Sequence, residues 1–340
     1  TAAASPEHPV TLDVTEVIPA GSVPTYPITE GKAARIMTGA PVPEGADAII
    51  MHERTSFTKN TVTLTAPVTS ANIIPPGEDV AAGTLLVPKG KILTASDLAL
   101  IAGQGIAEIG VYKKLSIGLI STGSELLNTG SPLEYGKIYN TNPYLLGGYI
   151  QKHHMTANYL NTVSDDLDSL CRAVLEALKT NDVVITTGGV SAGDFDYMPE
   201  VIRRIGGDLL FHRLKFKPGG AMLGAFKDGK VILGLSGNPG AAATGLLCVG
   251  FPFMRKLSGR SDITFSQATA YLGVDFKKSS PVTRILKGHS DFKNGMLYFT
   301  PLSNQHNGSV SSMSDCDLLA IIPAGSKPLA AGDKLEVYIL

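Results

Sequence analysis

Three glycine-containing loops in the middle of the chain carry the residues best suited to chemistry. They span 120–125, 186–193 and 235–239, and each follows an apolar run and precedes an expected helix. Glycine lets backbone N–H groups approach an anion, and a helix N-terminus adds a partial positive charge. One such loop is more often only a tight turn. Three of them favour a polyanionic ligand, such as a nucleotide or a phosphorylated cofactor, and none matches the P-loop or the GxGxxG fingerprint.

Two carboxylates and one lysine follow these loops in the sequence. Asp194 and Asp196 come directly after the second loop, and oxygen ligands of this kind suit Mg²⁺ held against a phosphate. The same two carboxylates could instead only stabilise the N-terminus of the next helix, where the helix dipole favours negative charge. Lys217 begins a Lys-Pro-Gly turn, where its ammonium could neutralise a phosphate or an oxyanion or could remain a solvated surface group. The sequence indicates an anion site with a divalent cation and leaves these simpler interpretations open.

A serine hydrolase is a rival interpretation of the second loop. Residues 189–193 read Gly-Val-Ser-Ala-Gly, which is the nucleophile pattern of such enzymes with Ser191 at its centre. The two aspartates that follow would raise the energy of an oxyanion rather than lower it. His212, His289 and His306 are the candidate bases, and none has a visible partner. The hydrolase therefore ranks below the anion site.

The elements that must position these residues change character along the chain. Short apolar stretches between Pro/Gly turns indicate strands near the N-terminus, whereas buried strands alternate with helices from Lys113 onward. Asn142-Pro143 and Asn238-Pro239 read as helix starts, the second running to about Lys256. We expect an α/β plus β multidomain protein, with a central doubly wound, mostly parallel α/β domain flanked by small β domains and a C-terminal β barrel. The expected parts are a β-rich cleft domain at 1–78, a linker or dimerisation segment at 79–112, the α/β domain at 113–262 and the barrel at 263–340.

Composition narrows the class of protein and its compartment. The 340 residues carry 29 Lys and Arg against 30 Asp and Glu, a balance that argues against binding nucleic acid or an acidic membrane surface. No apolar run approaches the length of a membrane helix, and no signal peptide opens the chain, so we expect a cytoplasmic protein. The three cysteines are far apart and are expected to be reduced. The histidine spacing does not suit zinc.

Several motifs taken together resemble the molybdopterin molybdenumtransferase family, which includes the C-terminal domain of gephyrin. The resemblance covers essentially the whole chain in the right order. It rests on Arg35-Ile-Met-Thr-Gly-Ala-Pro-Val-Pro43, Gly45-Ala-Asp47, Gly77-Glu-Asp79, Ser121-Thr-Gly-Ser-Glu-Leu126, Thr187-Gly-Gly-Val-Ser-Ala-Gly-Asp-Phe-Asp196, Lys217-Pro-Gly219 and Ser236-Gly-Asn-Pro239.

The resemblance implies an activity and a site. The activity is Mg²⁺-dependent insertion of molybdate into adenylylated molybdopterin with release of AMP, although tungstate, a tetrahedral dianion of nearly the same size, is not excluded. Catalytic roles fall on Asp196, Lys217 and Thr38, and the metal ligands would be Asp196, Asp194 and Glu125. The pterin-nucleotide would be held by Thr122, Gly123, Ser124, Glu125, Gly188, Gly189, Val190, Ser191, Pro218, Gly219, Ser236, Gly237, Asn238 and Pro239.

The resemblance also implies partners. It predicts a homodimer whose active-site cleft lies between the α/β domain of one subunit and the second subunit, with other cofactor-biosynthesis proteins as further partners. Thr94-Ala-Ser-Asp97 predicts a capped helix in the linker, and its Leu98, Leu100 and Ile101 are expected to be buried at an interface. The family's N-terminal Ser-x-x-Asp-Gly-Tyr-Ala segment is not in this sequence, which opens on Thr-Ala-Ala-Ala. We expect a trimmed chain or a missing segment.

Some positions depart from the family pattern. Gly220 stands where a second lysine is usual and Ile74 where an arginine is expected, so two positive charges are missing. Ser236 replaces a proline, and Ser124 an acidic residue. A weakened anion site could make the chain a non-catalytic molybdopterin-binding or scaffold homologue, which is the alternative to the enzyme. With Lys217 as the principal cation of its turn, Gly220→Lys is expected to tighten molybdate binding unless the backbone requires glycine.

Overall fold

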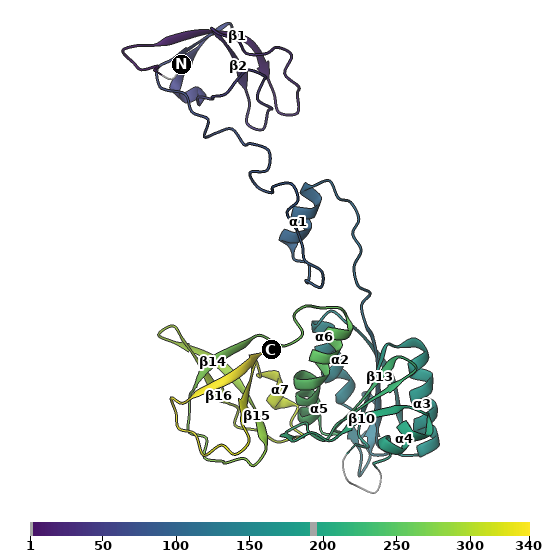
Figure 1. Cartoon of the computed structure of the whole chain (residues 1–340). Helices are drawn as coiled ribbons and strands as arrows, with labels where there is room; N and C mark the ends of the chain where they lie inside the picture. The colour runs from purple at the N-terminus through teal and green to yellow at the C-terminus, as the bar shows by residue number, and fades with distance from the viewer. Residues whose placement is uncertain (1–2, 191–195) are drawn as a thin grey trace. The chain divides into compact units, whose positions relative to one another are not determined.

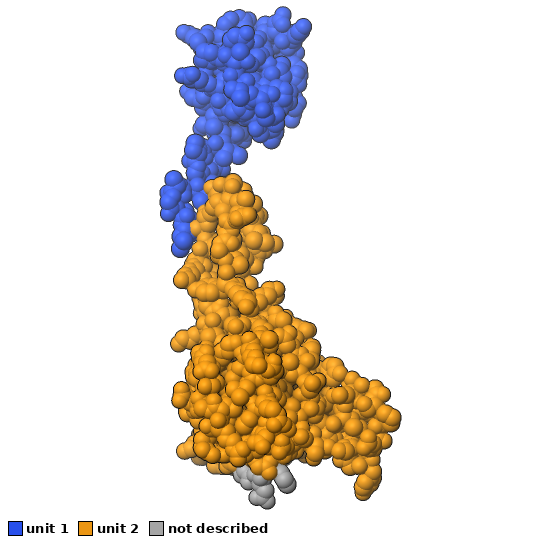
Figure 2. All heavy atoms as spheres, turned by 90° about the vertical axis from the view of Figure 1, so that its right-hand side faces the viewer, with its two compact units in different colours: residues 1–85 blue, residues 86–340 orange. Residues whose placement is uncertain are grey.

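The computed structural model describes residues 3–190 and 196–340, which form two compact units, residues 1–85 and 86–340 (Figure 2). Unit 1 is built on a four-stranded sheet with the strand order β2-β1-β4-β3. Its core is small and is centred on Ile18 and Leu64, which are 1% and 2% exposed. Its elements are β1 (Val10–Ile18), β2 (Lys32–Ile36), a 3₁₀ turn (His52–Arg54), β3 (Thr55–Phe57) and β4 (Thr61–Leu64).

Unit 2 begins with a short capped helix, α1 (Ala95–Gly103). The predicted cap is confirmed, because the Thr94 side chain accepts from the Asp97 N–H while the Asp97 carboxylate accepts from the Thr94 N–H. Lys91 adds an ion pair of 2.6 Å to Asp97. Of the residues expected to be buried at an interface, Ile101 is already buried within the chain and Leu98 is 54% exposed.

The α/β part of unit 2 holds a six-stranded mixed sheet with the order β10-β12-β13-β9-β5-β8. Strands β13, β9, β5 and β8 are parallel, and an antiparallel pair, β12 and β10, extends one edge. This agrees with the predicted mostly parallel sheet. The strands are β5 (Ser116–Thr122), β8 (Thr156–Val163), β9 (Val183–Thr187), β10 (Asp208–His212), β12 (Leu223–Lys227) and β13 (Lys230–Leu235), and a small pair, β6 (Leu126–Leu127) and β7 (Ile138–Tyr139), stands apart.

Helices cover both faces of this sheet (Figure 1). Residues of α3 and α4 pack on one face with Ile120 and Val184, and residues of α2, α5 and α6 pack on the other with Ile117 and Ile185. The helices are α2 (Asn142–Lys152), α3 (Leu167–Thr180), α4 (Met198–Arg204), α5 (Pro239–Gly245) and α6 (Phe251–Leu257), and a π turn, Leu246–Gly250, joins the last two. The predicted helix starts are close: α2 begins at Asn142, with Thr141 rather than Asn142 at its N-cap.

The C-terminal part of unit 2 is a closed five-stranded barrel. Strands pair in the order β15-β16-β14-β18-β17, and β17 returns to β15. Asn294 and Gly295 both have positive φ and form the tight turn between β15 and β16. The elements are β14 (Gln267–Leu272), β15 (Thr283–Lys293), β16 (Met296–Pro301), α7 (Ser311–Ser314), β17 (Leu318–Ile322) and β18 (Lys334–Ile339). The predicted barrel is therefore confirmed.

One short strand connects the two parts of unit 2. Strand β10 ends at His212, and the chain then leaves the α/β sheet. Residues Phe216–Lys217 form β11, which pairs in parallel with Thr283 and Arg284 of β15 in the barrel. The Lys-Pro-Gly turn therefore lies at the junction between the α/β sheet and the barrel.

Candidate functional site

The three glycine-containing loops meet at one edge of the α/β sheet. Strands β5, β9 and β13 are parallel neighbours, so their carboxyl ends lie together. The Gly188 N–H donates to the Leu235 carbonyl at 3.0 Å, and the Thr122 hydroxyl donates to the Thr187 carbonyl at 3.3 Å. These hydrogen bonds hold the three loops next to one another, whereas the ligand that they bind stays a prediction.

Gly188 is required by this close approach of the loops. Its φ of 100° lies in the region that favours glycine, and a Cβ there would overlap the hydroxyl oxygen of Thr122. On its other side, a Cβ on Gly237 would come within 3.6 Å of the Gly188 Cα. Close packing of the backbone at glycine positions therefore brings the three loops together at this edge.

A buried asparagine ties the third loop to a helix. Asn142, 5% exposed at the start of α2, donates from Nδ2 to the Gly237 carbonyl at 2.9 Å. Its Oδ1 is buried and has no hydrogen-bond partner among the described residues. The sequence identified Asn142 only as a helix start, because the partner is distant in sequence. We identify it as a residue that positions the loop.

The predicted acidic ligands lie at the same edge. Asp196 is half-buried directly before α4, and the Glu125 carboxylate folds back toward Gly123. Asp165 accepts a hydrogen bond from the Ser124 N–H at 3.2 Å, which fixes the first loop. Ser191 and Asp194 lie outside the described residues. In the described part of the chain no three His, Cys, Asp or Glu side chains form a metal cluster. Mg²⁺ often takes only one or two protein carboxylates beside water and phosphate oxygens, so Asp196 and Glu125 are a compatible donor set.

A cavity of about 490 Å³ lies between the α/β part and the barrel, and it is bordered by cations. Lys217 and Arg284 are register partners in the β11–β15 pairing, and both line it together with Arg213. Its lining contains no Asp or Glu, and Ser236 of the third loop is part of the same wall. The cavity therefore adjoins the loop cluster and suits a small, strongly charged anion.

The two arginines were not predicted, and they correct one expectation. Lys217 is not the lone cation of the site, since Arg213 and Arg284 border the same cavity. The Arg284 Nε is buried without a partner among the described residues. Restoring a lysine at position 220 is not the simple repair expected, because a Cβ on Gly220 would overlap the carbonyl oxygens of Phe216 and Leu214. Glycine is needed there for close packing of the backbone and not for a positive φ.

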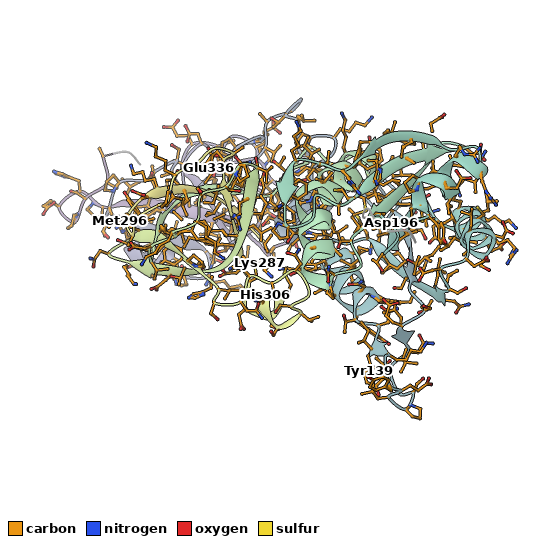
Figure 3. The ribbon with its side chains drawn as sticks, turned by 90° about the horizontal axis from the view of Figure 1, so that it is seen from below. Tyr139, Asp196, Lys287, Met296, His306 and Glu336 are labelled. Atoms are coloured by element: carbon orange, nitrogen blue, oxygen red, sulfur yellow. The ribbon has the colours of Figure 1, made fainter. Side chains whose placement is uncertain are left out.

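A buried lysine holds the barrel side of this cavity. Lys287, on β15, is fully buried and donates from Nζ to the His306 carbonyl at 3.2 Å and to the Ser312 hydroxyl at 2.5 Å. Figure 3 places Lys287 and His306 at the junction of the barrel with the α/β helices. Burial lowers the Lys287 pKa from its usual value. These contacts fix the segment that carries the cavity-lining Gln305 and Asn307.

The hydrolase interpretation finds no support in the described residues. The Nε2 of His212 lies 3.3 Å from the Val190 carbonyl oxygen, so this ring nitrogen already contacts the backbone. Ser191 itself lies outside the described residues. His306 is engaged through its backbone at the barrel junction.

Thr38, the predicted cleft residue of the N-terminal part, is exposed on the turn after β2 in unit 1.

Three segments of the chain, which together cover most of its length, match known protein families. Residues 118–256 match a family described as "probable molybdopterin binding domain", residues 1–105 match the MoeA N-terminal region (domain I and II), and residues 269–340 match the MoeA C-terminal region (domain IV). A molybdopterin molybdenumtransferase of Bacillus subtilis is 37% identical over 345 residues, covering 100% of this chain and 80% of the relative. One from Staphylococcus aureus is 35% identical over 337 residues, covering 99% and 80%. A crystal structure of a molybdopterin biosynthesis MoeA protein from Pyrococcus horikoshii covers 99% of this chain and 83% of its own, with 28% identity and a TM-score of 0.84.

Proposed function

Because the chain belongs to the molybdopterin molybdenumtransferase family and is an enzyme of molybdenum cofactor biosynthesis, we propose that it inserts molybdate into adenylylated molybdopterin in a Mg²⁺-dependent reaction that releases AMP. The observation that carries this proposal is the cavity bordered by Arg213, Lys217 and Arg284, which shares Ser236 with the strand-end loops. A nucleotide on the loops and an oxyanion in the cavity would then lie side by side.

Each part of the site has a physical role in this proposal. The backbone N–H groups of the loops and the start of α5 at Pro239 favour the negative charge of the pterin-nucleotide phosphates. The guanidinium of Arg284 and the ammonium of Lys217 attract the molybdate dianion and hold it beside the loops. Because no carboxylate lines the cavity, this attraction is not offset by a nearby negative charge.

Asp196 and Glu125, with Asp194, would hold Mg²⁺ at the same edge of the sheet. When bound, the ion supplies positive charge that neutralises the phosphate oxygens of the departing AMP. Asn142 and Gly188 keep the loops in place during the reaction, since one fixes the Gly237 carbonyl and the other permits the close approach to Thr122. Thr38 is proposed as a residue of the opposite cleft wall.

We also propose the predicted division of the chain at residues 78, 112 and 262, and a homodimer. The dimer is supported by apolar side chains exposed in and after α1: Leu98 is 54%, Ile106 43%, Ile109 41% and Val111 70% exposed. Light scattering at micromolar concentration tests this, and a monomer mass would contradict it. No helix in the described ranges is both long and apolar enough to cross a bilayer. The cytoplasmic location stays a prediction.

The central experiment measures AMP release. The purified chain is mixed with adenylylated molybdopterin and Mg²⁺, with molybdate, with tungstate or with neither, and AMP is quantified by chromatography. We expect AMP only when the oxyanion is present. Tight binding of adenylylated molybdopterin without AMP release would contradict the proposed reaction and favour a binding protein.

A further inference from the structure

A second cavity, of about 600 Å³, lies at the other end of the α/β helices. It is lined by Lys152 and His153, which follow one another at the end of α2, and by Arg255 of α6. The start of α2, at Asn142, contacts the loop cluster. Lys152 follows Asn142 by ten positions, so the second cavity lies about 15 Å away along the helix. It is therefore separate from the proposed active site.

Arg255 is the unusual residue of this cavity. It is only 5% exposed, and no carboxylate of the described residues lies within salt-bridge distance of it. Burial lowers its pKa from the usual value, which reflects the cost of keeping the charge away from water. Buried charges in proteins are normally paired, because an unpaired one is expensive. Among the described residues, no carboxylate forms the ion pair that a buried guanidinium normally has.

The contacts of Arg255 hold the guanidinium in place without satisfying it. Nη1 donates to the Thr264 carbonyl at 2.7 Å, Nη2 lies 3.3 Å from Nδ1 of His153, and Nε is buried with no partner. The group also stacks 4.3 Å from the centre of the Phe265 ring. Two of the five N–H donors are thus used by the described residues. The fork is oriented in advance, and the second N–H groups of Nη1 and Nη2 are not used by the described residues, whereas Nε is sealed from the cavity.

The rest of the lining is consistent with an anionic ligand that carries an apolar group. Lys152 supplies a second, exposed cation. Asp262 is the acidic side chain in the wall; it is paired with Arg260, with N···O distances of 2.9 Å and 2.5 Å, and it also acts electrostatically on Arg255. The last residue, Leu340, lines the cavity as well. Hydroxyl groups come from Ser261, Thr264 and Ser266, and apolar surface from Ile263, Phe265 and Ile339.

We propose that this cavity is a binding site for a phosphate group, either inorganic phosphate or a small phosphate monoester, held by the Arg255 fork and by Lys152. Two cations match a dianion, and a planar guanidinium matches two oxygens of a tetrahedral anion. A monoester would place its organic part on the apolar wall. This site is independent of the proposed reaction, since none of its residues belongs to the strand-end loops or to the first cavity.

The test uses His153 as a local reporter, because phosphate would also bind near the active site. The ring proton NMR signals of His153 are identified by their loss in His153→Asn. Inorganic phosphate and phenyl phosphate are titrated into the full chain, with sodium chloride at equal ionic strength as the control. We expect saturable shifts with both phosphates and a lower midpoint for phenyl phosphate if the ester is the natural class.

Two variants and a matched control assign the shifts to the site. Arg255→Lys keeps a charge but loses the fork, and Lys152→Gln removes an exposed charge with little risk to folding. Each is expected to raise the phosphate midpoint about tenfold or more. Lys256→Gln, on the same helix but outside the cavity, should leave it unchanged. No saturable shift up to about 50 mM phosphate, a limit well above a millimolar Kd, would overturn the proposal, as would shifts that survive both variants.

Discussion

The side chain of Asn142 and the backbone carbonyl of Gly237 are joined by a hydrogen bond of 2.9 Å that connects the start of α2 to the loop before α5. This loop supplies Ser236 to the cationic cavity, so one buried amide holds the loop where it meets the cavity. Asn142→Ala should raise the KM for adenylylated molybdopterin several-fold and lower stability by about 1 kcal/mol, the usual net value of a lost hydrogen bond. Gln151→Ala, at an exposed position of the same helix, is the control. An unchanged KM would mean that the loop holds its place without Asn142.

Removing the cations of the first cavity should weaken molybdate binding. Lys217→Gln and Arg284→Gln are each expected to raise the molybdate dissociation constant about tenfold or more, since each removes a charge-assisted contact. The wild-type affinity should also fall steeply with salt. Calorimetric titration measures both effects. Lys215→Gln, an exposed lysine beside the cavity but not in its lining, should bind molybdate like the wild type. Equal losses in all three variants would point to a diffuse field rather than to this cavity.

Asp196→Asn tests the proposed metal role. The variant keeps the size of the side chain and removes its charge, so Mg²⁺-dependent AMP release should disappear while the melting temperature stays close to that of the wild type. Asp208→Asn, at an exposed position of β10, serves as the control. Wild-type turnover of Asp196→Asn at limiting Mg²⁺ would remove Asp196 from the metal site.

Gly220 should not tolerate a side chain. Because a Cβ there overlaps two backbone carbonyl oxygens, Gly220→Ala and Gly220→Lys should both destabilise unit 2, by about 1–3 kcal/mol as for other overpacked sites, and neither should tighten molybdate binding. Gly148→Ala is the matched control, since this exposed helical glycine has open space around it and alanine favours a helix. It should be neutral or slightly stabilising. Thermal unfolding distinguishes the two positions. A stable Gly220→Lys variant that binds molybdate more tightly would support the original expectation that a lysine at position 220 strengthens the anion site.

His153 should make stability depend on pH. Burial, with further contributions from Arg255 and Arg260, lowers the pKa of His153 from 6.5 to about 4. Between these values the unfolded chain binds a proton that the folded chain does not, so the free energy of unfolding falls as the pH falls from about 6.5 toward 4. The stability of the wild type relative to His153→Asn should therefore decrease over this range. His154→Asn, at the exposed neighbouring position, should follow the wild type, and parallel curves for all three proteins would contradict the assignment.

Local patterns in the sequence predicted most of the elements that position the site. The capping box at Thr94 and the helix starts at Asn142-Pro143 and Asn238-Pro239 each follow from residues within a few positions of one another. The sequence also identified the three glycine-containing loops, and the parallel strands β5, β9 and β13 bring these loops together at one edge of the sheet. Lys217 was identified as a candidate anion-binding residue because it precedes a Pro-Gly turn.

The unpredicted residues depend on contacts between distant segments. Arg284 joins Lys217 only through the β11–β15 pairing, and no spacing in the sequence indicates that β11 leaves the α/β sheet. Arg255 reads as an ordinary basic residue near a helix end until its burial and its stacking on Phe265 are known. The requirement for Gly220 was equally hidden, because the carbonyl groups that exclude a side chain come from the fold of the turn.

The crossing of β11 from one sheet to the other has a consequence for how the protein folds. The cavity walls are brought together by strands far apart in the chain, so they cannot form while either part of unit 2 is still unfolded. Lys287, whose buried amine binds the segment facing α5, adds a second such dependence. One hydrophobic core joins residues of the α/β part, such as Ile117 and Ile185, to Ile285 and Leu319 of the barrel. The cavity between the two parts therefore depends on the folding of both, and a truncation within the barrel would remove part of its wall.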